Sequence, residues 1–274
     1  MQCWYVKRGE VMQFGMPTLI EIKFVEDCTA LCHELGLGFV EFYMDLPEYQ
    51  IEELDSIQLA KTAGKYGIYY TIHLEDTAYP WNFNKRLAEG YTETVLQTIE
   101  VAKQLSVPVL NMHFHQGEYF TLPDRKAYLL AEYRAEYLQK LTAFRDACTK
   151  AVGSAEMKIC VENTRSFQLD FVAEGVAILL ESPVFALTFD TGHNASNDFQ
   201  QQPLIERHID RLSHMHLHDY SKTRGDHLLL GEGELDLVKY LDIAEKHNCR
   251  VVLETKTIDG LRQSVNWLKE RGYI

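Results

Sequence analysis

The feature that most constrains the fold of this chain is a regular alternation of short apolar segments with longer amphipathic ones. Eight apolar segments are predicted to be strands: 11–17, 38–44, 68–74, 108–114, 157–163, 184–190, 212–219 and 249–255. The intervals between them and the C-terminal segment show helical periodicity, as in 51–67, 126–152 and 258–274. Because no hairpin signal joins consecutive strands, the alternation predicts a parallel sheet.

Eight strand–helix units in a chain of 274 residues match the size and the count of a single-domain (β/α)8 TIM barrel. A doubly wound open sheet is the alternative, and the absence of a G-x-G-x-x-G motif after the first strand disfavours a dinucleotide-binding form of it. No linker or low-complexity tract divides the chain, so we expect residues 1–274 to form one domain. Residues 1–10 are predicted to form an N-terminal leader or a small hairpin.

The composition narrows the class of protein. A formal net charge of −13 disfavours binding of nucleic acid through bulk charge. The six cysteines contain no C-x-x-C pair, which indicates a reducing compartment without structural disulfides. Charged residues stand near the N-terminus where a signal peptide has an apolar run, and no stretch reaches the ~18 apolar residues of a membrane span. We therefore expect a cytoplasmic protein without a membrane or nucleic-acid partner.

Acidic residues and histidines collect at the carboxyl ends of the predicted strands. In a parallel barrel these ends meet at one mouth, where the active sites of such barrels are built. Four consecutive strands end in or near Glu162, Asp190, His216 and Glu254. Four further histidines follow the same pattern in strands three and four and in two loops, namely His73, His113, His193 and His227. Any one of these residues alone would more simply be a solvated loop residue or a helix cap, but their recurrence favours a shared site.

Three carboxylates and one imidazole at the mouth would form an oxygen-rich site with about three negative charges. Without a cation, their mutual repulsion and desolvation would be costly. A divalent metal ion removes that cost, and the ligand types suggest Mn²⁺, Mg²⁺ or Co²⁺. Zn²⁺ becomes the better choice if the other histidines also bind metal.

Five motifs in the chain resemble those of the xylose isomerase-like barrel superfamily. They are VENT (161–164), DTGH (190–193), HLHD (216–219), DHLLLGEGELD (226–236) and LET (253–255). The superfamily contains sugar and sugar-phosphate isomerases and epimerases, and also the endonuclease IV enzymes. The resemblance runs from about Phe14 to the C-terminus, and it implies that Glu162, Asp190, His216 and Glu254 are the metal ligands.

For the epimerases of this superfamily, the resemblance implies that Glu162 and Glu254 act as acid and base on a small sugar, ketose or sugar phosphate. Chelation by the metal acidifies a C–H beside the carbonyl, and proton removal gives a cis-enediolate. His193 would hold a substrate oxygen. Dehydration of a keto-cyclitol or keto acid would use the same chemistry. Dimers and tetramers are frequent among such isomerases, so a homodimer or tetramer is expected.

The endonuclease IV branch provides the competing interpretation, a zinc phosphodiesterase that acts on abasic-site DNA. His73, His113, His193 and His227 occupy the histidine positions of that branch's three-zinc site. The chain departs from the pattern because Asp226 stands one place late. Strand four also reads HFHQG, which leaves His113 and His115 as rivals. The four histidines would thus bind a second metal, bind substrate hydroxyls or pack at the mouth.

The segment SHMHLHD (213–219) places His214, His216 and His218 on one face of a strand. Residues two apart lie ~6.6 Å apart along a strand, so a single metal cannot bind all three. His216 lies level with the other strand ends and is the expected ligand. His214 is expected to be a hydrogen-bonded core histidine, and His218 with Asp219 is expected to orient ligands from outside the coordination sphere.

Several residues carry weaker predictions. Trp81 is expected either to wall the sugar site or to cover the barrel rim. Lys222 and Arg224 either bind a distal phosphate or carboxylate or are solvated loop charges. Glu41, on strand two, is expected to be a salt-bridged core residue. The long segment 115–126 after strand four is expected to be a lid.

Overall fold

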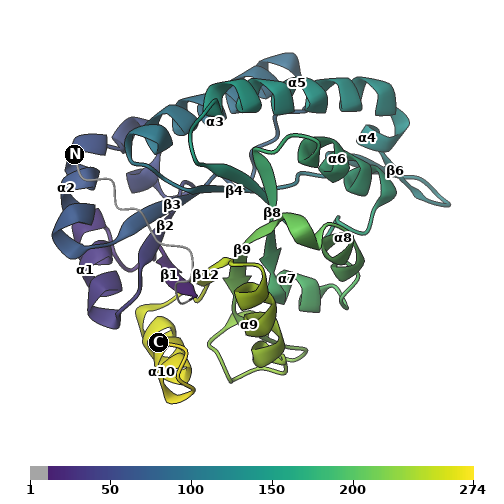
Figure 1. Cartoon of the computed structure of the whole chain (residues 1–274). Coiled ribbons are helices and arrows are strands. Elements are labelled where there is room, and N and C mark those ends of the chain that lie inside the picture. The colour runs from purple at the N-terminus through teal and green to yellow at the C-terminus, as the bar shows by residue number, and fades with distance from the viewer. Residues whose placement is uncertain (1–11) are drawn as a thin grey trace.

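The computed structural model describes residues 12–274 and shows a closed barrel of parallel strands with helices around it (Figure 1). The strands follow one another around the barrel in the order β1-β12-β9-β8-β7-β4-β3-β2. Their bounds are β1 Gln13–Pro17, β2 Phe39–Tyr43, β3 Tyr69–His73, β4 Val109–His113, β7 Lys158–Glu162, β8 Phe185–Asp190, β9 Leu212–Leu217 and β12 Arg250–Leu253. Each lies inside a predicted segment, so the predicted (β/α)8 barrel is confirmed. The predicted leader at 1–10 lies outside the described residues.

The helices cover the outside of the barrel. The α-helices are α1 Val25–Leu35, α2 Ser56–Tyr66, α3 Lys85–Gln104, α4 Leu129–Glu132, α5 Arg134–Val152, α6 Asp170–Leu180, α7 Thr191–Ser196, α8 Gln202–Arg207, α9 Leu237–Lys246 and α10 Ile258–Glu270. Short 3₁₀ turns are η1 Pro47–Tyr49, η2 Ile51–Glu53 and η3 Ile209–Arg211. Side-chain caps begin several helices: Asp55 accepts hydrogen bonds from two amides of α2, and Thr257 accepts one from α10. Within residues 12–274, every helix is too short or too polar to cross a membrane.

Two loops at the carboxyl ends of strands fold into small hairpins that the sequence pattern did not predict. One pairs β5 Tyr119–Thr121 with β6 Lys126–Tyr128, and the other pairs β10 Asp219–Ser221 with β11 Gly225–Leu228. The predicted helix over 126–152 is therefore wrong at its start, because residues 126–128 are held in antiparallel pairing. It is also interrupted at Tyr133, whose backbone (φ −108°, ψ 41°) separates α4 from α5.

The barrel has an apolar outer layer and a polar interior near the strand ends. Outward-facing strand residues such as Val40, Met215 and Leu217 are fully buried under the helices. Among the residues that point inward, Glu41 and Asn111 are also buried, and they are hydrogen bonded to other interior side chains.

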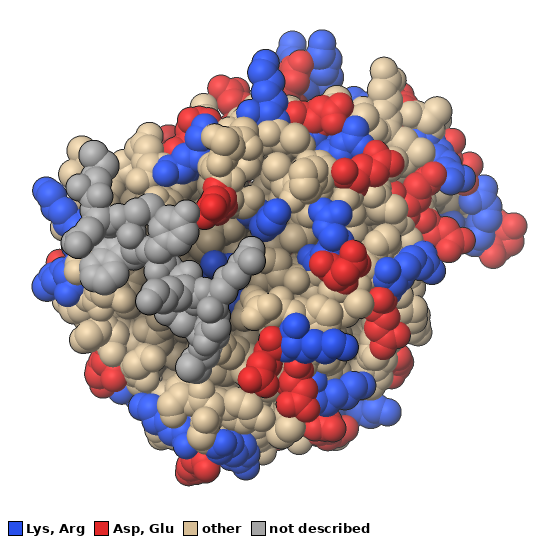
Figure 2. All heavy atoms as spheres, in the orientation of Figure 1, with Lys and Arg blue, Asp and Glu red and all other residues tan. Residues whose placement is uncertain are grey.

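On the face shown in Figure 2, acidic and basic side chains are interspersed over the surface.

The close contact between α5 and α6 predicts that one methyl group added at Gly175 will lower the stability of the protein. A Cβ added at Gly175 would lie 1.9 Å from the Tyr137 hydroxyl and 2.6 Å from Phe114 Cζ, both on buried side chains. We expect Gly175→Ala to lower the free energy of unfolding by about 1–3 kcal/mol through overpacking. Gly90→Ala is the matched control: Gly90 is exposed in α3 with open space around it, so about 0.5–1 kcal/mol of stabilisation is expected there. Urea unfolding measures both values, and equal effects would contradict the packing.

Candidate metal centre

The four predicted ligand residues converge at the mouth of the barrel. His216 Nδ1 lies 3.3 Å from Glu162 Oε2, 3.3 Å from Glu254 Oε2 and 3.9 Å from Asp190 Oδ2. Glu162 and Asp190 are the last residues of β7 and β8, and Glu254 directly follows β12. Because parallel neighbours end at the same level, residues spread over about ninety positions of sequence meet around one imidazole nitrogen.

Hydrogen bonds from neighbouring strands fix these carboxylates. Asn111 donates its side-chain amide to Glu162 Oε2, and its own oxygen accepts from the Thr188 hydroxyl at 2.5 Å. Asp190 caps α7, because its Oδ1 accepts from the amide of His193 at 2.5 Å. The glutamate and aspartate are therefore held in place by the scaffold rather than by one another.

His218 orients Asp190 from outside the cluster. The Nδ1 atom of His218 accepts a hydrogen bond from the backbone amide of His227 (2.7 Å), so its proton lies on Nε2, which donates to Asp190 Oδ2 at 3.0 Å. Its ring packs so closely on the DTGH glycine that a Cβ at Gly192 would lie 2.0 Å from His218 Cε1. The glycine of that motif is required by this contact.

The cluster has the properties of a site for a divalent cation. Glu162 Oε1, Glu254 Oε2 and His216 Nδ1 are buried and have no hydrogen-bond partner. Leaving such atoms unpaired costs free energy, and here they all border one small volume. Three carboxylates and an imidazole are a ligand set that divalent ions accept. The residues present therefore fit a divalent metal ion.

The charges of the cluster are strongly coupled. Burial disfavours the ionised form of Glu162, but His216 and His113 outweigh burial and hold its pKa well below the usual range. Burial also opposes the charged form of His216, yet the carboxylates of Glu162, Glu41 and Glu254 raise its pKa well above the usual value. A protonated His216 thus offsets part of the carboxylate charge when no metal is bound.

Three more histidines surround Glu162. His73 Nε2 lies 3.4 Å from Glu162 Oε2, His113 Nε2 lies 3.4 Å from Oε1, and His193 Nδ1 lies 3.1 Å from Oε1. Of the two rivals on strand four, His113 therefore faces the centre. His115 instead stacks on Tyr79, with ring centroids 4.4 Å apart.

The nitrogens of His73 and His113 that face away from Glu162 have partners of their own. His73 Nδ1 donates to the backbone carbonyl of Leu74 at 2.7 Å, so Nε2 carries a proton toward Glu162 in the charged imidazole and presents a lone pair there in the neutral one. His113 Nδ1 lies 3.2 Å from Asp76 Oδ1, and the other oxygen of Asp76 accepts the Tyr43 hydroxyl. Such outer partners fix the tautomer of metal-binding histidines.

A further group forms beside the centre from His193, Asp226 and His227. Their potential ligand atoms all lie within 4.8 Å of one another. Asp226 stands one position later than the aspartate of the endonuclease IV pattern, yet its side chain reaches this group. The backbone permits this because Gly225 (φ 86°) and His227 (φ 55°) both adopt the left-handed region, which changes the direction of the hairpin strand.

The residues with weaker predictions lie away from this centre. The Arg224 guanidinium is paired with Glu232 at 2.8 Å, and the Lys222 side chain is exposed, so the structure places neither at the metal centre. Trp81, expected either to wall the sugar site or to cover the barrel rim, is fully buried, and its indole N–H donates to the carbonyl of His115 at 3.0 Å. Asp219 shapes the following loop by accepting from the amides of 231, 233 and 235.

Two charged residues that line the cluster, Asp76 and Lys256, were not predicted from the sequence. Asp76 follows His73 by three positions in HLED, and Lys256 follows Glu254 by two in LETK. Lys256 Nζ lies 2.8 Å from Glu254 Oε1; burial opposes its charge, but Glu254 raises the pKa of the ammonium group. The feature of the sequence that could have identified both residues is a charged side chain two or three positions after a predicted ligand.

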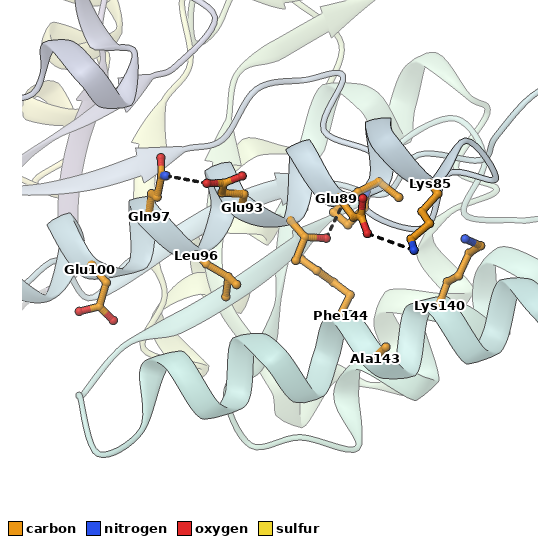
Figure 3. Close-up of a pocket in the computed structure, with 12 residues that line it drawn as sticks. Lys85, Glu89, Glu93, Leu96, Gln97, Glu100, Lys140, Ala143 and Phe144 are labelled. Carbon is orange, nitrogen blue, oxygen red and sulfur yellow. Dashed lines mark hydrogen bonds and ion pairs between the residues drawn. The ribbon is translucent and has the colours of Figure 1, made fainter.

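A separate groove of about 620 Å³ lies on the outer wall between α3 and α5 (Figure 3). Its lining includes Leu96, Phe144 and Glu93, together with the Lys85–Glu89 pair at 3.6 Å. The lining residues contain no histidine, so the groove is distinct from the metal centre.

Comparisons with known proteins agree with the fold and the motifs. A family model described as xylose isomerase-like TIM barrel matches residues 29–271. The structure of a D-tagatose 3-epimerase-like protein superposes with a TM-score of 0.77 at 21% identity, covering 94% of this chain and 96% of that one. A 3-keto-D-glucoside 4-epimerase of E. coli gives 0.70 at 15% identity, covering 94% and 99%. The IolI protein with a zinc atom gives 0.70 at 13% identity, covering 94% and 96%.

The histidines around Glu162 predict how the metal-free protein responds to pH. Burial opposes their charge, but Glu162 raises the pKa of His73 to about 9, and Asp190 with Glu162 raises that of His193 to about 10, against 6.5 for the ordinary imidazole. The folded state thus holds more protons above pH 6.5, and the stabilisation is complete below that value. Stability should fall as pH rises from about 6.5 to about 9 or 10, because the unfolded chain loses these protons near pH 6.5 while the folded state retains them up to its own higher pKa values.

Urea unfolding in the presence of a chelator measures this dependence. His193→Gln should reduce the slope of stability against pH, while His33→Gln, which removes an exposed histidine, is the matched control. A stability that stays constant or rises with pH over this window would contradict the assigned charges.

Proposed function

The chain belongs to the xylose isomerase-like TIM barrel family, and we propose that it is a divalent-metal-dependent isomerase or epimerase of a small sugar, ketose or sugar phosphate. The observation that carries the proposal is the ring of unpaired, buried ligand atoms on Glu162, His216 and Glu254, completed by Asp190. The named epimerases that share the fold support the sugar substrate.

The metal would be held by Glu162, Asp190, His216 Nδ1 and Glu254. If these residues bind a divalent ion, Mn²⁺, Mg²⁺, Co²⁺ or Zn²⁺, the chemistry that it would supply is polarisation of a substrate carbonyl, which would acidify the adjacent C–H. The zinc atom in the IolI structure supports a divalent ion in this fold.

Glu162 and Glu254 are the proposed acid and base. Burial opposes ionisation of Glu254, but Lys256 and His216 hold its pKa well below the usual range, so its carboxylate is ionised at neutral pH and can accept a proton. Glu162 is ionised for a similar reason. Removal of a proton by one glutamate leaves an enediolate. Its return to the opposite face of the same carbon epimerises the sugar, and its return to the neighbouring carbon isomerises it.

The half-buried histidines at the rim are suited to bind the substrate. The side chains of His113, His193 and His227 are 19%, 22% and 23% exposed, whereas that of His216 is 1% exposed. Ring N–H groups at this depth could donate to the hydroxyls of a sugar bound at the mouth of the barrel. Dehydration of a keto-cyclitol or keto acid would follow from the same proton removal if a hydroxyl on the adjacent carbon left.

A second candidate function is a zinc phosphodiesterase of the endonuclease IV kind. The observation that favours it is that two further groups, His73 with Asp76 and His113, and His193 with Asp226 and His227, could each hold an ion. Metal analysis of the purified protein distinguishes the two functions. One ion per chain with turnover of a ketose supports the isomerase, and three ions with cleavage of an abasic-site oligonucleotide support the nuclease.

Glu254→Gln tests the acid–base role. The amide cannot accept the substrate proton, so we expect at least a 100-fold loss of kcat on the sugar that the wild type converts. Exchange of the substrate C–H with deuterium from D₂O should fall in parallel. Glu245→Gln, on the exposed face of α9, is the matched control and should keep wild-type rates. Undiminished turnover by Glu254→Gln, with metal bound, would rule out this role.

A further inference from the structure

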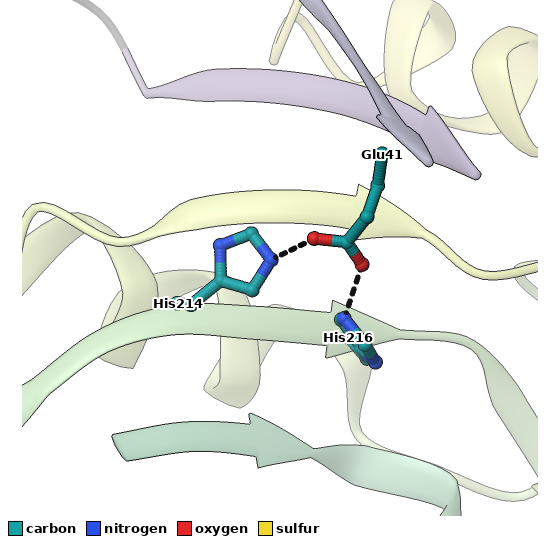
Figure 4. A group of neighbouring side chains, drawn as sticks. All are labelled: Glu41, His214 and His216. Atoms are coloured by element: carbon teal, nitrogen blue, oxygen red, sulfur yellow. Dashed lines mark hydrogen bonds and ion pairs between the residues drawn. The ribbon is translucent and has the colours of Figure 1, made fainter. Parts of the chain in front are cut away.

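A buried glutamate reaches across the barrel to the strand that carries His216 (Figure 4). Glu41 lies on β2, and β1 and β12 separate that strand from β9 in the barrel. Its Oε1 lies 2.7 Å from His216 Nε2, and its Oε2 lies 2.8 Å from His214 Nε2. All three side chains are buried. The contact thus joins non-neighbouring strands through the interior, directly beneath the metal centre.

The hydrogen bonds of this group determine where its protons lie. Glu41 Oε2 also accepts the Thr71 hydroxyl at 2.8 Å, so the carboxylate receives three hydrogen bonds. An ionised carboxylate can only accept, so each imidazole donates its Nε2–H. His216 then presents the lone pair of its neutral form at Nδ1, which is the unpaired atom 3.3 Å from both Glu162 and Glu254.

The second histidine gives the carboxylate a fixed orientation. With Oε2 held by both Thr71 and His214, only Oε1 remains for His216. The other nitrogen of His214, Nδ1, is buried and has no partner, so its bond to Glu41 is the only side-chain hydrogen bond of this imidazole in the described structure. A simple core ion pair would need only one imidazole.

We propose that Glu41 is a positioning residue of the metal centre: anchored by His214 and Thr71, it fixes the tautomer and rotation of His216 so that Nδ1 is the metal-binding atom. This inference rests on the proposed function in one respect, namely that a divalent ion binds at this centre. It extends the site to a residue on the opposite side of the barrel. In the sequence, Glu41 is the single charged residue of the strand FVEFY.

Glu41→Gln is the direct test. Glutamine offers one acceptor oxygen and one NH₂ donor, so one of the two imidazoles loses its acceptor. If the NH₂ faces His216, that ring must carry its proton on Nδ1, where the metal binds. We expect affinity for Co²⁺ or Zn²⁺, measured by competition with a chelator, to fall about 10- to 100-fold. The absorption spectrum of the Co²⁺ form should change as well, which loss of stability alone would not cause.

Thr71→Val is the matched control. It removes a hydrogen bond to the same carboxylate with little change of shape and leaves both imidazole contacts intact, so metal affinity should fall much less than in Glu41→Gln. Equal affinity and an unchanged Co²⁺ spectrum in folded Glu41→Gln would overturn the inference while leaving the proposed function in place. A wild-type protein that binds no divalent ion would instead overturn the proposed function, and this inference with it.

A measurement on the wild type keeps the test valid if Glu41→Gln does not fold. In the zinc-loaded protein with ¹⁵N-labelled histidine, the His216 resonances should show a metal-bound Nδ1 and a protonated Nε2. Coordination through Nε2 would overturn the inference, because that nitrogen would then carry no N–H to donate to Glu41.

Discussion

The repulsion among buried carboxylates is the constraint on which the rest of this structure depends. Glu41, Glu162, Asp190 and Glu254 all lie within 4 Å of His216, and each is less than a tenth exposed. Four like charges in so small a volume would oppose folding. The surrounding histidines, Lys256 and hydrogen-bond donors from the barrel wall reduce that cost. A divalent ion would reduce it further, which couples metal binding to stability.

The parallel barrel is what makes this concentration of charge possible. Its strand ends deliver one side chain each to the same level, while the backbone hydrogen bonds of the closed sheet hold them there. The centre is built in two layers. The upper layer supplies the atoms that face the ion, and the layer below, with Glu41, Asn111 and Thr188, orients them. Residues of the lower layer are as necessary to the geometry as the ligands themselves.

The strands and the four central residues were predictable because both depend on local patterns. Strand periodicity is visible in sequence, and a charged residue at the end of an apolar strand marks the barrel mouth. The partner of Glu41 was not predictable, because its contacts span 173 and 175 positions of sequence across the barrel. The reach of Asp226 depends on left-handed backbone at 225 and 227, which spacing alone does not show. The burial of Trp81 likewise depends on how a loop folds over Phe114.

The most direct test of this account is the position of the metal in a crystal of the metal-loaded protein, measured by anomalous diffraction. The account predicts a strong anomalous peak about 2.0–2.3 Å from His216 Nδ1 and from carboxylate oxygens of Glu162, Asp190 and Glu254. Further peaks beside His73 and His227 would add ions without changing this result. A peak at Glu41 and the Nε2 atoms of His214 and His216, or no peak at the mouth of the barrel, would contradict it.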